Sequence, residues 1–443
     1  MTGITPDQHD VAVAGDAMVT KRLSTIERDR FAGLRSVVTD ADASIVNLEG
    51  PIHDYDVAPS QRRRTHFRSP AWALDELEWM GFDLFSAATN HVGDYGQGGM
   101  SNTMAELRDR TLPFAGIGRT LTRARSPAYY DAGPGRVALL GATTTFVPGT
   151  EAADPREDVP GRVGVAPIRM NARYELSRSN YRAMKAIAED LGMGELRETR
   201  GAYVRRTGDD AIPFIDVGSG TAGRTVTFTE GPENRIVYSM SDEDRAAALD
   251  HVRTAVGKAD TVVFSLHTHE GAGGAYNAPS VPKAVETFAR ECVDAGADLF
   301  FCHGPHHVRG IEVYDGAPIF YGLGNVVLQY NDVSHFPAED YQSRGLAMDA
   351  PPREIHDEIG NIVSTDRWNE GIVPVCTATE DGVTDAQIHP VELGGDRSHS
   401  TNGTGFLAPE GAGESTFERV ADRSAVYGTS IDIADGVGSL RGL

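Results

Sequence analysis

Asp10-Val11-Ala12-Val13-Ala14-Gly15-Asp16, near the start of this 443-residue chain, is a run of small and branched apolar residues that ends at a carboxylate. Such a run predicts a β-strand that is buried on both faces, as in the parallel sheets of α/β layered folds. In those folds, ligands bind beyond the carboxyl ends of the strands. Asp16 therefore marks one edge of a predicted site.

The same arrangement recurs along the chain, and helical patterns separate its copies. Apolar runs over 44–48, 83–88, 261–266 and 298–302 are followed by Glu49, Asn90-His91, His267 and His303. Ser69 and Pro70 predict a helix that starts there, with Ser as the N-cap and Pro at the first helical position, and ends at Gly81. Further helices are expected over 98–110 and 282–295, and one is expected from Ser241 onward. The alternation predicts an α/β fold whose strand ends share one site.

Two parts of the chain depart from this rhythm. Residues from about 150 to 235 are rich in Pro, Asp and Gly and hold one helical pattern, at about 172–191. We interpret them as an insertion, either a lid or a recognition element. The catalytic domain is predicted to span 1–345 with this insertion inside it.

The last hundred residues, 346–443, are predicted to be a turn-rich segment that packs on the core. They carry a possible strand pair around 373–379 and 386–391, and just before them a β-hairpin is expected at 311–321 around Asp315-Gly316. Whether the segment closes over the site or braces the sheet is left open by the sequence.

Metal ligands are the simplest explanation for polar residues at five strand ends. A carboxylate or imidazole at one strand end means little alone, but five at the same topological position indicate a single site. His303-Gly304-Pro305-His306 adds a second imidazole on a tight turn. The predicted ligands are Asp16, Glu49, Asn90, His267, His303 and His306. This oxygen and nitrogen set, without thiolate, suits a divalent ion such as Ca, Mn, Mg, Zn or Fe, and the sequence does not select among them.

An acid/base pair is predicted beside these ligands. His91 follows Asn90, and Asp94, three residues on, can hold the other ring nitrogen and raise the basicity of the imidazole. Gly93-Asp94-Tyr95-Gly96 is equally a plain turn. Asp16 and His303 are the other candidates for proton transfer.

Four neighbours of the ligands are predicted to bind substrate. These are His269, Glu270, His307 and Arg309. For His269 and His307, a purely structural hydrogen-bonding role is an equally good interpretation. That structural role is preferred for His53, His66, His251 and His389.

Composition excludes some classes of partner. The net charge of −23 argues against nucleic acid and against a polybasic membrane anchor. No stretch approaches the roughly 18 apolar residues of a membrane span. Residues 1–10 lack the basic and apolar regions of a signal peptide, so a cytoplasmic location is expected. The three cysteines form no CxxC pair and are expected to be buried apolar residues.

Taken together, these motifs resemble the CapA (poly-γ-glutamate capsule biosynthesis) family of calcineurin-like metallophosphatases. The matching pieces run in family order over about residues 10–330: Gly15-Asp16, Asn47-Leu48-Glu49, Asn90-His91, Asp94-Tyr95-Gly96, His267–Glu270, Asp298, His303–His306, Arg309–Glu312 and Tyr321–Asn325. The resemblance implies a two-sheet sandwich flanked by helices, with a metal site where the carboxyl ends of the sheets meet. Thr89 replaces the first Asn of the usual Asn-Asn-His, and the expected lack of an export signal puts a capsule role in doubt.

A cytoplasmic CapA-like chain also resembles the lasso-peptide epimerases. That resemblance implies inversion of Cα at the C-terminal residue of a ribosomal precursor peptide, with a metal to stabilise the enolate-like intermediate and acid/base residues on both faces. The alternative is a metal-dependent hydrolase of phosphoesters or γ-glutamyl amides. A non-catalytic module that binds an acidic polymer is a third, weaker hypothesis, because the acidic chain would repel such a ligand. The oligomeric state is left open.

Overall fold

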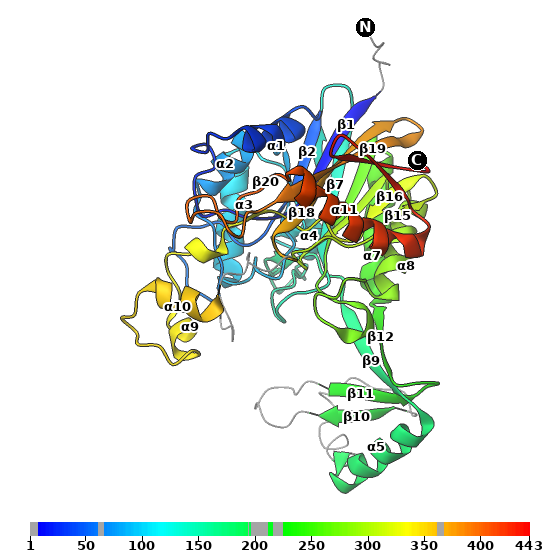
Figure 1. The fold of residues 1–443 in the computed structure, drawn as a ribbon. Coiled ribbons are helices and arrows are strands. Elements are labelled where there is room, and N and C mark those ends of the chain that lie inside the picture. The colour runs from blue at the N-terminus through cyan, green and yellow to red at the C-terminus, as the bar shows by residue number, and fades with distance from the viewer. Residues whose placement is uncertain (1–7, 61–65, 194, 196–210, 216–224, 361–366) are drawn as a thin grey trace.

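The computed structural model describes residues 8–60, 66–193, 195, 211–215, 225–360 and 367–443. These residues form a mixed α/β fold in which two large sheets lie against each other between helices (Figure 1). The α/β class is as the sequence predicts. The finer assignment to the calcineurin-like metallophosphatase sandwich stays a prediction.

The larger sheet has ten strands, and β1 lies inside it. Its order is β21-β22-β19-β18-β1-β2-β3-β4, with β17 also paired to β1 and β20 to β19. β2, β3 and β4 continue from β1 in parallel, whereas β18 is antiparallel to β1. The bounds are β1 (His9–Met18), β2 (Ala43–Leu48), β3 (Leu84–Ser86), β4 (Phe114–Ala115), β17 (Asn325–Leu328), β18 (Glu370–Thr379), β19 (Gly382–Glu392), β20 (Phe406–Leu407), β21 (Ile431–Ala434) and β22 (Val437–Leu440).

The second large sheet has six strands in the order β15-β16-β14-β13-β7-β6. Its central strands β7, β13, β14 and β16 are parallel, and their registers align His267 with His303. The bounds are β6 (Ala128–Asp131), β7 (Arg136–Thr143), β13 (Thr261–His267), β14 (Leu299–His303), β15 (Ile311–Tyr314) and β16 (Ala317–Phe320). A small pair, β5 (Ile117–Gly118) and β8 (Gly164–Val165), lies outside both sheets.

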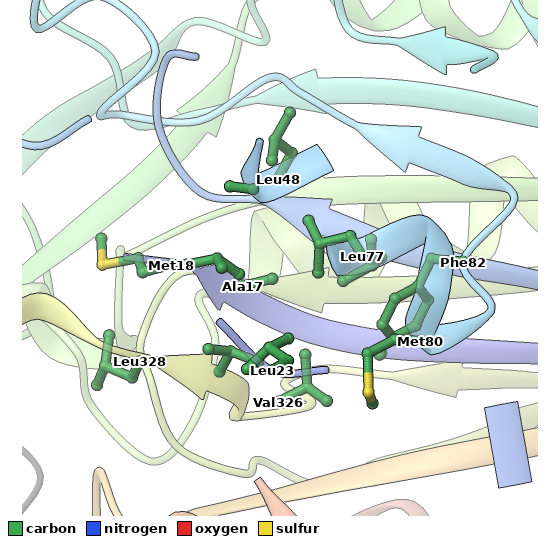
Figure 2. Close-up of a cluster of buried hydrophobic side chains, with 14 of the residues drawn as sticks. Ala17, Met18, Leu23, Leu48, Leu77, Met80, Phe82, Val326 and Leu328 are labelled. Carbon is green, nitrogen blue, oxygen red and sulfur yellow. The ribbon is translucent and has the colours of Figure 1, made fainter. Parts of the chain in front are cut away.

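Three buried clusters hold these layers together. Val11 and Ile45 of the ten-stranded sheet share one cluster with Leu139 and Phe301 of the six-stranded sheet. The helices α1 (Asp29–Thr39) and α2 (Ala73–Met80) cover the outer face of the ten-stranded sheet, where Figure 2 shows side chains of β1, α2 and β17 in contact. The helices α7 (Asp242–Val256) and α8 (Lys283–Asp294) cover the six-stranded sheet. The large apolar area removed from water in these layers is the main stabilising contribution.

The predicted insertion holds a sheet of its own. Strands β9 (Met170–Leu176), β10 (Ile212–Ile215), β11 (Thr225–Glu230) and β12 (Arg235–Met240) form it, and α5 (Arg178–Asp190) packs against β9, β10 and β11. These elements stand apart from the two large sheets (Figure 1). The helix predicted from residue 172 was wrong at its start, because Met170–Leu176 forms a strand. Every second residue of this strand is half-buried, and the residues between them are either exposed or buried, as the two faces of a strand require. The lid or recognition role stays a prediction.

The C-terminal segment contributes strands to the ten-stranded sheet, and β18 lies next to β1. β18 and β19 confirm the predicted strand pair, and β18 pairs with β1 over His9–Ala12. The segment also holds α10 (Pro352–Ile359) and α11 (Glu410–Ser424), and α9 (Ala338–Gln342) precedes it. At least this part of the C-terminal segment therefore braces the sheet.

Helix boundaries and cysteines largely follow the sequence. α2 ends at Gly81 as predicted, but it begins at Ala73, because Ser69 pairs with the backbone around Ile52 and cannot cap a helix. Ser241 does cap α7, and the hairpin β15–β16 turns at Asp315-Gly316. The chain also forms the long helix α3 (Gly96–Asp109) and the short helix α4 (Leu121–Arg125). All three cysteines are buried and free. Among the described residues, no helix has the length and apolarity that crossing a bilayer requires.

Candidate metal centre

Two carboxylates come from adjacent strands of the ten-stranded sheet. Asp16 lies in β1 at an irregularity in its pairing with β2, and Glu49 directly follows β2. The side-chain amide of Asn47 donates to Oδ1 of Asp16 and to Oε2 of Glu49, both at 2.7 Å. Gly15 allows the close approach of the 324 backbone, because a Cβ there would lie 2.0 Å from the Gly324 carbonyl oxygen. The carboxylates are therefore buried and held side by side.

Two imidazoles from the six-stranded sheet face them. His267 and His303 end β13 and β14 in register, and their Nδ1 atoms are 3.0 Å apart. His267 Nδ1 is 3.5 Å from Oε2 of Glu49, and His303 Nδ1 is 3.7 Å from Oδ1 of Asp16. One ligand atom from each of these four buried residues lies within 4.8 Å of the others. The structure thus brings four of the six predicted ligands together.

The turn after β14 places His306 at the same centre. Gly304 and His306 have φ values of 108° and 62°, in the left-handed region that a non-glycine residue adopts at some cost. The Gly304 amide donates to Asp16, and His306 Nδ1 is 3.0 Å from Oδ2 of Asp16 and 3.0 Å from Oδ1 of Asn325. A strained histidine held by two oxygen atoms indicates a functional constraint on this turn.

Burial keeps the imidazoles neutral, which is the form that binds a metal. Burial lowers the pKa of His267 well below its usual value, that of His303 to about 4 and that of His269 to about 3, with neighbouring histidines adding to the effect for His267 and His269. Burial alone would raise the pKa of Asp16, but the nearby His306 and His303 more than offset it, so the net pKa is lowered. The lowered pKa values of Asp16, His267 and His303 favour the protonation states that bind a metal.

The donor set fits a divalent ion. Ser265 donates to Ser86, so its oxygen accepts from Nε2 of His303 at 2.7 Å, which leaves the lone pair of His303 on Nδ1, toward the carboxylates. Within the described part of the chain, Oδ1 of the buried Asn47 has no hydrogen-bond partner. A hard cation would satisfy such a cluster of oxygen and nitrogen lone pairs. The metal's identity is not fixed by this geometry.

The predicted acid/base pair is present beside the cluster. His91 Nδ1 lies 2.7 Å from Oδ2 of Asp94, and the same carboxylate oxygen accepts from the amide of Phe67 at 2.8 Å. Asp94 is fully buried, whereas the side chain of His91 is 15% exposed. His91 is also close enough to His267 to lower the pKa of that residue. The pair therefore lies between the buried cluster and solvent.

The remaining predicted residues lie around this centre with different partners. Asn90 is buried at the start of the turn that carries His91, and its role as a ligand stays a prediction. His269 Nε2 is 3.1 Å from His267 Nε2, as their spacing predicts. Glu270 accepts hydrogen bonds from the hydroxyls of Thr144, Thr145 and Thr268.

His307 and Arg309 are held by the main chain. The ring nitrogens of His307 face the carbonyls of Val308 and Asn277, and the fully buried Arg309 donates to those of Ala278 and Glu270. These contacts favour a positioning role, and substrate binding by these residues stays a prediction.

Sequence reasoning gave no role to several residues that touch the site histidines. The ring of Tyr276, 63% exposed, stacks on His269 at 4.7 Å, and the ring of Trp368 lies 4.7 Å from His306. Asn325 binds His306 through both its oxygen and its amide. Asn325 and Asn47 lie inside the motifs that matched the family, which was the available signal. Trp368 lies 62 residues beyond His306 in the chain, and no local pattern points to it.

Comparison with known proteins finds similarity over the part of the chain that contains these motifs. The family described as bacterial capsule synthesis protein PGA_cap matches residues 10–330. This chain belongs to that family. An uncharacterized protein of Sinorhizobium fredii, y4sH, is 28% identical over 98% of this chain and 93% of its own length. The capsule biosynthesis protein CapA of Bacillus anthracis is 22% identical over 72% of this chain and 59% of its own length. A probable polyglutamine synthesis accessory protein of Mycobacterium tuberculosis is 26% identical over 67% and 58%.

The family match accounts for the site but not for the whole chain. All four residues of the metal-competent cluster, and the His91–Asp94 pair, lie within residues 10–330. The strands β18 and β19 and Trp368 lie beyond them. This PGA_cap member therefore combines a candidate site within the matched residues with a C-terminal segment that reaches it through Trp368.

Proposed function

We propose that this PGA_cap protein is a divalent-metal-dependent enzyme that uses His91, with Asp94, to move a proton on its substrate. The observation that supports it is the partly exposed His–Asp pair beside a buried cluster of carboxylates and neutral imidazoles. Asp16, Glu49, His267 and His303 would hold the metal. When bound there, a divalent ion would stabilise negative charge on a substrate oxygen or lower the pKa of a water.

Asp94 prepares His91 for proton transfer. Its carboxylate accepts a hydrogen bond from the Nδ1–H of His91, and the lone pair of the imidazole is then on Nε2. Burial of Asp94 and the amide of Phe67 fix the carboxylate, so the ring is oriented before the substrate arrives. The buried carboxylate also stabilises the imidazolium that forms when His91 takes a proton. Such a base contributes on the order of 10²–10⁴-fold to a rate.

The reaction we favour is epimerisation at the Cα of a peptide's C-terminal residue. Epimerisation needs one group to remove a proton and another to return it on the opposite face. On this proposal two histidine–carboxylate pairs take these roles, His91 with Asp94 and His306 with Asp16, and both histidines retain some exposure. On this proposal the substrate is a ribosomal precursor peptide, and the enzyme acts in the cytoplasm.

Hydrolysis of γ-glutamyl amides or phosphoesters is the second candidate. The names of the Bacillus anthracis and Mycobacterium tuberculosis relatives concern capsule biosynthesis and polyglutamine synthesis, which favours an amide substrate. In a hydrolase, one His–Asp pair would suffice to activate a water or protonate a leaving group. The His306–Asp16 contact would then only position ligands.

Incubation in D₂O separates the two reactions. The purified protein is mixed with a panel of peptides, γ-glutamyl peptides and phosphoesters, and products are analysed by mass spectrometry and chiral amino-acid analysis. Deuterium at Cα without fragmentation would support the epimerase, and amine or phosphate release would support the hydrolase.

Two treatments test the shared proposal. EDTA should abolish either reaction, and Asp94→Asn should lower kcat by about 10²-fold, because the amide cannot stabilise the imidazolium. The exposed Asp381→Asn serves as the matched control. Turnover that survives both EDTA and Asp94→Asn would rule the proposal out.

A further inference from the structure

Another histidine–aspartate pair is buried near His91 and Asp94. His66 and Asp340 come from distant parts of the chain, and their side chains are 0% and 1% exposed. His66 Nδ1 is 3.1 Å from Oδ2 of Asp340, and the backbone amide of His66 donates to the same oxygen at 3.2 Å. Asp340 belongs to α9, so the pair ties α9 to the segment that ends at His66.

The other ring nitrogen of His66 contacts Ser60, six residues earlier in the chain. His66 Nε2 is 2.8 Å from the carbonyl oxygen of Ser60, and residues 61–65 between them lie outside the described residues. The imidazole of His66 therefore lies between the Asp340 carboxylate and the Ser60 carbonyl, with one ring nitrogen facing each.

Both ends of this loop hold Asp94. The backbone amide and the hydroxyl of Ser60 donate to the carbonyl oxygen of Asp94, at 2.8 and 2.9 Å. Phe67, next to His66, donates its amide to Oδ2 of Asp94, the oxygen that also accepts from His91. The ring of Phe67 lies 6.0 Å from that of His91, edge to face. These contacts join residues 60 and 67 to Asp94 and His91.

We propose that His66 and Asp340 act as a clasp that positions the Asp94 carboxylate, and through it the ring of His91. The proposal rests on the proposed function, because it assigns a positioning role for that acid/base pair. The clasp is His66 with Asp340 and Ser60. It spans 274 residues of sequence and makes the geometry of the pair depend on the docking of α9.

Charged and titratable groups around the clasp favour this arrangement. Just beyond α9, Arg344 places a guanidinium nitrogen 3.7 Å from Oδ1 of Asp340 and helps to hold the carboxylate. The ring of Tyr95 lies 5.9 Å from that of His66, and burial raises the pKa of its phenol, so it stays neutral. Without the clasp, the ends of the loop are free to separate, and a displacement of about 1 Å at a catalytic group can cost on the order of 10²-fold in rate.

Proton NMR of the Nδ1–H of His91 tests the clasp without a substrate. A proton held at 2.7 Å between imidazole and carboxylate gives a far-downfield resonance that exchanges slowly with water. The resonance is assigned by its loss in His91→Gln. His66→Gln and the isosteric Asp340→Asn should each broaden it or remove it, whereas His251→Gln, on α7, should leave it unchanged.

Turnover gives the second readout. We expect kcat to fall by about 10-fold in His66→Gln and Asp340→Asn, with KM little changed, because binding groups are not altered. A folded Asp340→Asn protein that keeps both the resonance and full kcat would overturn the clasp. If His91→Gln were fully active, the proposed function would fail, but the resonance would still decide whether the clasp holds the pair.

Discussion

Mild acid should destabilise the folded protein through the site histidines, when no metal is present. Burial lowers the pKa of His303 to about 4, that of His269 to about 3 and that of His307 to about 4, against about 6.5 in an unfolded chain. Below pH 6.5 the unfolded state therefore binds more protons than the folded state. Stability is present above pH 6.5 and is lost as the pH falls toward the folded pKa values.

The size of the effect follows from these values. Between pH 7.5 and 5.0, each such histidine costs about 2 kcal/mol of unfolding free energy. Asp298 has the opposite effect. Burial raises its pKa to about 6 in the folded state, so the folded protein binds a proton there before the unfolded chain does, and this adds about 1 kcal/mol to the unfolding free energy at pH 5.0. The net loss is a large share of the roughly 5–15 kcal/mol that stabilises a typical protein.

Urea unfolding in EDTA, followed by circular dichroism at pH 7.5, 6.5, 5.5 and 5.0, measures the loss. In His303→Asn, the loss over this interval should be smaller by about 2 kcal/mol, since one buried imidazole is gone. His399→Asn replaces an imidazole that is 78% exposed and should behave as wild type. A stability that is flat from pH 7.5 to 5.0, or a His303→Asn protein with the full loss, would refute the reasoning.

Two further predictions concern the metal centre and its packing. Asp16→Asn removes a buried carboxylate from the cluster and should weaken binding of divalent metal by at least about 10-fold. The metal content of dialysed protein is measured by mass spectrometry, with the exposed Asp381→Asn as the control. Equal metal content in the two variants would contradict the assignment. Gly15→Ala would place its Cβ 2.0 Å from the Gly324 carbonyl oxygen and should cost about 1–3 kcal/mol by urea unfolding, whereas Gly257→Ala, with open space around it, should cost little; similar values for the two would show that the 324 backbone gives way.

Local sequence patterns predicted most of the fold, the strand-end residues of the metal-competent cluster and the acid/base pair. The apolar runs that end at Asp16, Glu49, His267 and His303 were enough to predict strands with a common site, because parallel strands expose their carboxyl ends at one edge. The contact of His91 with Asp94 was also predictable, since three residues separate them and one turn joins them.

Local patterns failed where a distant segment changed the outcome. Ser69 has the residue type of a helix cap, but its backbone pairs with Ile52, and α2 begins later. The helix expected over 172–191 wrongly included residues 172–176, which belong to β9, because β9 gains its strand partners only from 225–240. Both errors reflect tertiary pairing that overrides a weak local preference.

The sequence by itself determined the α/β class, the family motifs, the set of metal-competent residues and the acid/base pair, because strand period, strand ends and short turns are encoded within a few residues. Only the tertiary structure decided that β18 lies beside β1, that Asn325 and Trp368 reach His306, and that His66 meets Asp340. Those contacts join residues 19 to more than 350 positions apart. They depend on how whole layers pack, and no local preference for helix, strand or turn records that.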